Sequence, residues 1–108
     1  MRFFGLKSCD TCRKALKSLV GQDVDVIDVR VDGVSATDRA AMIAAFGDAA
    51  INTRSTTWRN LSEDERALGT AALLAAHPTL MKRPVVEIDG ALYQGWTAAT
   101  KAALGLEK

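Results

Sequence analysis

Two cysteines, Cys9 and Cys12, lie three positions apart near the N-terminus, and the 108-residue chain contains no others. A Cys-x-x-Cys pair suits thiol–disulfide exchange, because one thiolate attacks a disulfide and a second thiol within reach releases the product. A structural disulfide across so short a loop would add little stability, since its constraint on the unfolded chain grows with loop length. Zinc needs about four ligands, and the one histidine is His77. The pair therefore predicts redox chemistry and no metal site.

The residues after Cys9 predict a helix whose first turn contains Cys12. Free N–H groups and the helix dipole favour an anion at a helix N-terminus, so we expect a lowered pKa at Cys9. Lys7 and Arg13 add positive charge nearby and are expected to contribute to the binding of an anionic substrate. Asp10 is the expected helix cap. We expect Cys9 to be the nucleophile and Cys12, on the same helix face, to be the resolving thiol. The alternative is that Cys12 is only a packed residue, because it falls on the apolar face.

The elements around this pair predict a β-α-β unit. Residues 2–6 form a short apolar run, and residues 10–20 have helical spacing that ends at Gly21. Residues 24–29 are rich in β-branched side chains, which is typical of a buried strand. Strand, helix and strand at this spacing predict two parallel strands with a right-handed crossover.

The middle of the chain is predicted to be a helical insertion over about residues 35–80. Ser35 with Asp38, and Ser62 with Glu65, are typical helix-capping pairs. Between them, residues 51–60 are polar and predict a loop with a short helical turn. Another helix is expected to begin at Thr70 and to end before Pro78.

The C-terminal third predicts a hairpin and a last helix. Asp89-Gly90 between two apolar runs suits a type I′ turn, and Thr97 is placed to cap a helix that ends near Gly105. The whole chain, residues 1–108, is therefore predicted to be one α/β domain. Its order is β-α-β, a helical insertion, then β-β-α, with a mixed four-stranded sheet.

Composition disfavours some classes of partner, although a local basic patch stays open. The chain has 14 Lys and Arg against 13 Asp and Glu, so it lacks the positive field of a nucleic-acid-binding domain. No apolar run approaches the ~20 residues needed to span a bilayer. The N-terminus does not resemble a signal peptide. We expect a cytoplasmic protein with no membrane partner and no direct nucleic-acid contact.

Three motifs resemble the arsenate reductase (ArsC)-like family, which includes the Spx branch. They are residues 4–16, 52–61 and 77–86. The resemblance implies a thioredoxin-like fold with a helical insertion and Cys9 as the nucleophile. It also implies that Arg54 and Arg83 hold an anion and that Pro84 follows a cis peptide bond. Without the family, both arginines could be read as solvated surface residues.

One departure from the arsenate reductases narrows the expected activity. Those enzymes carry a further arginine after the hairpin, whereas residues 92–96 contain none. Gly95 and Trp96 resemble a branch proposed to contain glutathione-dependent thiol reductases. Cys12 is also a departure, since glutathione-using arsenate reductases commonly lack it. The resemblance thus implies glutathione as co-substrate, a small thiol or anionic substrate, glutaredoxin as a candidate partner, and no tightly bound cofactor.

Two other functions stay open at this point. One is a redox-switched regulator of the Spx type, in which a Cys9–Cys12 disulfide changes a surface that binds RNA polymerase. The other is arsenate reduction itself. Structural roles are expected for His77 at a helix end and for Trp58 and Trp96 in packing.

Overall fold

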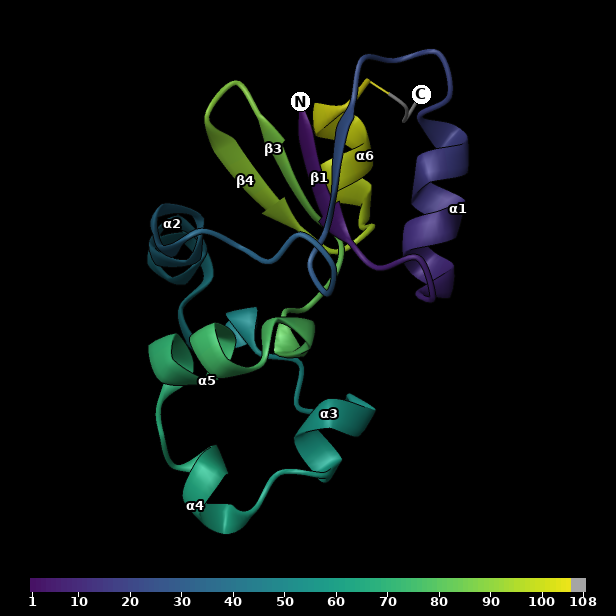
Figure 1. Cartoon of the computed structure of the whole chain (residues 1–108). Helices are drawn as coiled ribbons and strands as arrows, with labels where there is room; N and C mark the ends of the chain where they lie inside the picture. The colour runs from purple at the N-terminus through teal and green to yellow at the C-terminus, as the bar shows by residue number, and fades with distance from the viewer. Residues whose placement is uncertain (106–108) are drawn as a thin grey trace. The chain divides into compact units, whose positions relative to one another are not determined.

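A computed structural model describes residues 1–105, which form two compact units. One unit combines residues 1–32 with the chain from residue 83 onward, and the other is residues 33–82. The second unit has nearly the bounds of the predicted insertion. Figure 1 shows the strands of the first unit with α1 and α6, and the helices α2 to α5 of the second unit.

A mixed four-stranded sheet organises the first unit, with strand order β2-β1-β3-β4. β1 pairs in parallel with β2, and β3 pairs antiparallel with both β1 and β4, as the element order predicted. The helices α1 and α6 belong to the same unit. The bounds are β1 (Arg2–Gly5), α1 (Asp10–Ser18), β2 (Asp25–Asp28), β3 (Val85–Ile88), β4 (Ala91–Gln94) and α6 (Ala98–Ala103).

The core of this unit lies on the face of the sheet that carries Phe3 and Val86, which are paired across β1 and β3. Cys12, Ala15 and Leu19 from α1 pack against them, and all five side chains are buried. Partly buried residues at the edge of this cluster include Trp96 and Leu104, which agrees with the packing role expected for Trp96. Cys12 is therefore part of the core as well as part of the cysteine pair.

The prediction of a buried second strand holds at its end, where Val29 is buried, but is wrong for most of β2. β2 is an edge strand with one neighbour, β1. Val26 shares the sheet face of Phe3, yet 53% of its surface is exposed. Because the core cluster of this face contains α1 residues and central-strand residues but not Val26, the β-branched residues at this edge stay partly open to solvent.

The second unit is helical, as predicted. Segments 50–52 and 80–82 are joined by a bridge between Ile51 and Met81. Met42, Leu73 and Leu74 are buried. The helices are α2 (Ala36–Phe46), η1 (Gly47–Ala50), α3 (Thr56–Arg59), α4 (Glu63–Arg66), α5 (Thr70–Ala76) and η2 (Pro78–Leu80).

The helix caps and the hairpin turn predicted from the sequence are present in the structure. Ser35 accepts a hydrogen bond from the Asp38 N–H, and Ser62 with Glu65 forms a complete capping box. Thr97 caps α6 through the Thr100 N–H. Asp89 and Gly90 have φ angles of 50° and 85°, as a type I′ turn requires. Among residues 1–105, no helix is long and apolar enough to cross a membrane.

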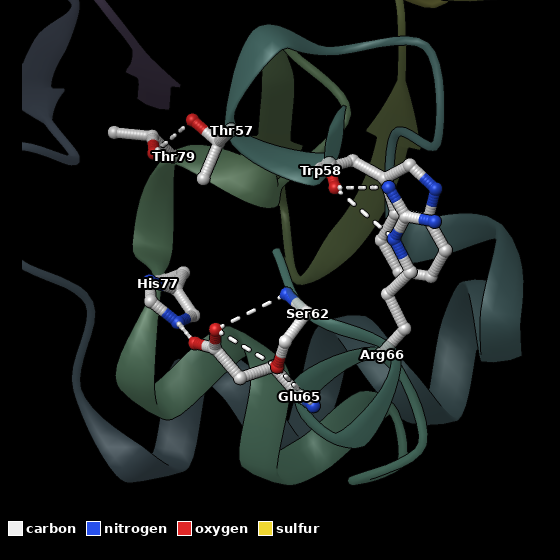
Figure 2. A network of polar contacts seen from close by, with 7 residues as sticks. All are labelled: Thr57, Trp58, Ser62, Glu65, Arg66, His77 and Thr79. Carbon is white, nitrogen blue, oxygen red and sulfur yellow. Dashed lines mark hydrogen bonds and ion pairs between the residues drawn. The ribbon is translucent and has the colours of Figure 1, made fainter. Parts of the chain in front are cut away.

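A polar network joins α3, α4 and the end of α5 (Figure 2). His77 Nε2 lies 3.3 Å from a Glu65 carboxylate oxygen, and the same carboxylate accepts from the Ser62 N–H. Arg66 donates to the Trp58 carbonyl at 3.1 Å and lies over the Trp58 ring. His77 is thus held within a structural network, in agreement with its expected role.

Candidate active site

The first helix begins where the sequence predicted, but Cys9 rather than Asp10 is its N-cap. Cys9 has extended backbone angles, φ −85° and ψ 118°, and Asp10 is the first helical residue. The Cys9 carbonyl accepts from the Arg13 N–H at 3.0 Å, and its N–H donates to the Leu6 carbonyl at 3.1 Å. The Asp10 carboxylate instead pairs with the Arg13 guanidinium. The cap position places the Cys9 sulfur beside the free N–H groups of the first turn.

Both cysteines are free thiols, and they differ in exposure. The Cys9 side chain is half-buried, whereas Cys12 is fully buried in the core. The Cys12 N–H and the Cys12 thiol both act on the Cys9 sulfur. Cys9 can therefore meet a solvent-borne disulfide, and Cys12 is next to it on the protein side.

The pKa of Cys9 is lowered despite its partial burial. Burial alone would raise this pKa, but hydrogen bonds from the Cys12 N–H, the Cys12 thiol and Arg83 lower it, and the charge of Arg83 adds to the effect. The Cys9 side chain makes no short capping hydrogen bond as a thiol. The Cys12 N–H is nevertheless close enough to stabilise the Cys9 thiolate. This agrees with the lowered pKa expected from the helix terminus.

Cys12 shows the opposite behaviour. Burial is the main cause that raises its pKa to about 12, and the neighbouring Cys9 raises it further. The Leu6 N–H and the charge of Arg83 lower the pKa of Cys12, but their effect is smaller than that of burial and Cys9. Cys12 is therefore a thiol at neutral pH, and Cys9 is the more readily ionised of the two thiols.

The register of the sheet brings Arg83 to this site. Phe4 pairs with Val85 in the antiparallel β1–β3 ladder. The residues just before β3 therefore run beside those just after β1, where the cysteine loop starts. Arg83 is half-buried here and donates to the Cys9 sulfur. The Arg83–Pro84 peptide bond is cis, as the family resemblance implied.

Lys7 and Arg13 have other partners in the structure. The charge of Lys7 acts on Asp28. Burial of Asp28 would raise its pKa, but hydrogen bonds from the N–H groups of Val31, Arg30 and Lys7 lower it. The charge of Lys7 adds to these bonds, and the net effect is a lowered pKa of Asp28. Arg13 pairs with Asp10. Both side chains line a cavity of about 540 Å³ between α1 and β2. Their role in anion binding stays a prediction, and the cation acting on Cys9 is Arg83.

Arg54 lies in the unit of residues 33–82, just before α3. Its N–H donates to the Asn52 side-chain carbonyl at 3.0 Å, within a tight turn. Its predicted role in holding an anion for Cys9 stays a prediction.

Gly5 is a site residue that sequence reasoning missed. A β-carbon at this position would lie 2.9 Å from Cys12 Sγ and 2.8 Å from a Phe3 ring carbon. Real β-carbons do not approach other atoms this closely, so Cys12 packs directly on the strand backbone. An isolated glycine within an apolar strand signals such a close approach and was the available clue.

Comparison with known proteins identifies the family. The model of the ArsC family matches residues 4–103. An uncharacterized protein of Haemophilus influenzae is 40% identical over 94 residues, covering 81% of this chain and 82% of that protein. The structure of the YFFB (PA3664) protein has a TM-score of 0.85 and 29% identity, covering 94% of this chain and 96% of the other. An arsenate reductase (ArsC) related protein from Brucella melitensis has a TM-score of 0.71 and 33% identity, covering 94% and 91%.

These matches confirm both the family resemblance and the α/β thioredoxin-like fold with a mixed four-stranded sheet. The chain therefore belongs to the ArsC family.

Proposed function

We propose that this protein is a cytoplasmic thiol–disulfide oxidoreductase that reduces small disulfides with glutathione. The observation that carries the proposal is the half-exposed Cys9 sulfur, whose pKa is lowered by Cys12 and Arg83. A thiolate available near neutral pH is the species that attacks disulfides. Membership of a family with arsenate reductase-related members supports a nucleophilic cysteine at this position.

In the first step, the Cys9 thiolate attacks one sulfur of a mixed disulfide between glutathione and a substrate thiol. A bond forms between Cys9 Sγ and the glutathione sulfur, and the substrate–glutathione bond breaks. The substrate leaves as a thiolate, which takes a proton from water. Cys9 now carries a glutathione adduct and has lost its negative charge, while Arg83 remains beside it.

In the second step, Cys12 releases glutathione. The loss of charge at Cys9 removes one cause of the raised pKa of Cys12. Cys12 then gives up its proton to water and attacks Cys9 Sγ. A Cys9–Cys12 bond forms, the bond between Cys9 and glutathione breaks, and glutathione leaves as a thiolate that takes a proton from water. Two further glutathione molecules return both cysteines to thiols and leave as one oxidised glutathione. Glutaredoxin is a second candidate reductant for this disulfide.

Mass spectrometry after treatment with oxidised glutathione tests this scheme. The wild type should give an internal disulfide, and Cys12→Ser should retain one glutathione adduct on Cys9. A lasting adduct in the wild type would remove the resolving role of Cys12. No adduct on Cys9 in either protein would overturn the proposed activity.

Turnover assays separate the proposal from its two alternatives. Reduction of a glutathione mixed disulfide, with little reduction of arsenate, is the expected result. Arsenate turnover that exceeds disulfide turnover would assign the protein to arsenate reduction. An oxidised form that binds RNA polymerase and has no turnover would assign it to Spx-type regulation.

A further inference from the structure

Trp96 follows β4 at the end of the sheet where the cysteine loop follows β1. β1 and β4 both pair antiparallel with β3, so the two strands run toward the same end of the sheet (Figure 1). Only β3 separates them, and neighbouring strands lie about 4.8 Å apart, so the ends of β1 and β4 are about 10 Å apart. The segment of Trp96 and the cysteine loop are therefore close neighbours within one unit of the structure.

Hydrogen bonds fix the backbone that leads into Trp96. The Gly95 N–H donates to the Pro84 carbonyl at 2.7 Å, which extends the β3–β4 ladder by one step. The Gly95 carbonyl accepts from the Thr100 hydroxyl at 2.8 Å, and Thr100 is buried. Gly95 has a φ of 79°, a left-handed value that favours glycine. The chain before Trp96 is thus held on both sides, next to the segment that supplies Arg83 to the Cys9 sulfur.

The Trp96 side chain is partly buried against the core and partly exposed. It packs against the core cluster that contains Phe3 and Cys12, and Cys9 packs against the same cluster. An aromatic ring held in this way offers a large, rigid contact surface, and a ligand loses little side-chain entropy by using it. A nucleophilic sulfur and a flat apolar ring therefore rest on one buried support, and both remain accessible from solvent.

The chain around this ring carries no charge, because residues 91–97 are all uncharged. The cation that acts on the Cys9 sulfur, Arg83, comes from the neighbouring segment. In an in-line attack on a disulfide, the leaving sulfur lies about 4 Å from Cys9 Sγ, or two S–S bond lengths. The carbon group on that sulfur then meets the side chains that flank Cys9. An apolar group gains by contact with the ring, whereas a charged group would lose hydration there.

We propose that Trp96 is a specificity-determining residue, whose ring contacts an apolar, uncharged group on the leaving thiol of the substrate disulfide. This role rests on the proposed function for the reaction itself, and it adds the chemical class of the substrate thiol. Thr100 is a positioning residue in this arrangement. Its hydroxyl holds the Gly95 carbonyl, and through it the backbone that carries Trp96.

Two substrates that differ only in the leaving thiol test the role of Trp96. Both are mixed disulfides of glutathione, one with benzyl mercaptan and the other with 2-mercaptoethanol. The ratio of their kcat/KM values is divided by the ratio of their rate constants with dithiothreitol in solution, which removes the difference in intrinsic reactivity. We expect the wild type to favour the benzyl substrate about 10-fold, near the upper value for an aromatic pair. A corrected ratio near 1 would overturn the proposal.

Substitutions of Trp96 should change this ratio, and a general loss of folded protein cancels because both substrates meet the same sample. Trp96→Ala should bring the corrected ratio close to 1, and Trp96→Phe should keep most of the preference. Trp96→Gln retains more side-chain volume for packing and should also lose the preference, so the test does not depend on one variant. A ratio that stays at the wild-type value in Trp96→Ala and Trp96→Gln would overturn the proposal.

Thr100 is tested with the same two substrates. Thr100→Val lacks the hydroxyl that bonds to Gly95 and should lower the corrected ratio about 3-fold, the value of one ordinary hydrogen bond. Thr100→Ser keeps the hydroxyl and should restore the ratio. An unchanged ratio in Thr100→Val would remove the positioning role of Thr100.

The matched control is Leu104→Ala. Leu104 packs against the same core cluster, but it lies at the opposite end of α6 from Trp96. Its truncation should lower stability and leave the corrected ratio at the wild-type value. A fall as large as that in Trp96→Ala would show a general effect of core packing and would overturn the specific role of Trp96.

Alkylation of Cys9 separates failure of this proposal from failure of the proposed function. N-benzyliodoacetamide and iodoacetamide need only a reactive sulfur, and the wild type should favour the benzyl reagent relative to glutathione in solution, whereas Trp96→Ala should not. If this preference is found without disulfide turnover, the proposed function is wrong and the contact with Trp96 stands. If turnover is found without either preference, the proposed function stands and the role of Trp96 is wrong.

Discussion

The Cys12 side chain packs directly on the backbone of Gly5, so that a β-carbon on Gly5 would lie 2.9 Å from Cys12 Sγ. This contact lets α1 approach β1 closely, and it determines where the Cys12 N–H and thiol lie relative to Cys9. The same two groups lower the pKa of Cys9. The position of the buried Cys12 thiol therefore links the core of the sheet to the reactivity of the half-buried Cys9 thiol.

Gly5→Ala should destabilise the protein and reduce the reactivity of Cys9. The added methyl group overpacks the contact with Cys12 and Phe3, at a cost of about 1–3 kcal/mol. Displacement of Cys12 weakens the groups that stabilise the Cys9 thiolate, so the pKa of Cys9 should rise. Urea denaturation measures the first effect, and the pH dependence of iodoacetamide labelling measures the second. The same substitution in a Cys12→Ala background should cost less, and an equal cost would contradict the contact.

Arg83→Gln should raise the pKa of Cys9, because it removes the positive charge that acts on the sulfur. The rate of alkylation at pH 7 should fall by a factor on the order of 10, since each pKa unit means tenfold less thiolate. At high pH, where Cys9 is fully ionised in both proteins, the difference should largely disappear. Arg13→Gln is the control, because Arg13 pairs with Asp10. Equal effects of the two substitutions would show that Arg83 has no special role.

Cys12 should be almost inert to alkylation in the native protein, even in Cys9→Ser. Burial is the main cause of its pKa of about 12, and burial remains when the Cys9 sulfur is removed. Iodoacetamide at pH 7.5, followed by intact mass, should label the wild type once, at Cys9. Labelling of Cys9→Ser should be slower by a factor on the order of 100. Rapid labelling of Cys12 in this variant would show that the thiol is accessible.

The helical unit should lose stability in acid through Glu65. The Ser62 N–H is the main cause that lowers the pKa of Glu65 below its usual 4.5, and Ser62 Oγ and His77 add to it. A carboxylate with a lowered pKa stabilises the fold fully above its ordinary pKa, and this contribution is lost as pH falls through the folded value. Glu65→Gln should therefore destabilise the protein at pH 7 and have little effect near pH 2.5. Denaturation at both pH values measures this.

The neighbouring Glu63→Gln is the control for that experiment. Glu63 is exposed in the same helix and lies outside the capping box. It should change stability less than Glu65→Gln at pH 7. A Glu65→Gln effect of equal size at both pH values would contradict the role of the ionised carboxylate.

Much of this fold is readable from short stretches of sequence. The caps at Ser35, Ser62 and Thr97 and the turn at Asp89-Gly90 depend on residues within four positions of one another. The order of strands and helices follows from hydrophobic spacing in the same local way. The family motifs also indicated the cysteine nucleophile and the cis bond before Pro84.

Neighbouring residues were enough to place the cysteine pair at a strand-to-helix junction, since helix capping and periodicity are local properties. The family resemblance already implied Arg83 at the anion site. The tertiary structure showed that Arg83, rather than Lys7 or Arg13, acts on the Cys9 sulfur, and that Val26 is exposed on an edge strand. It also decided that Cys12 lies against Gly5. These features depend on strand order and register, which join residues far apart in the chain. The spacing of residues along the chain does not show which strands pair or in which register.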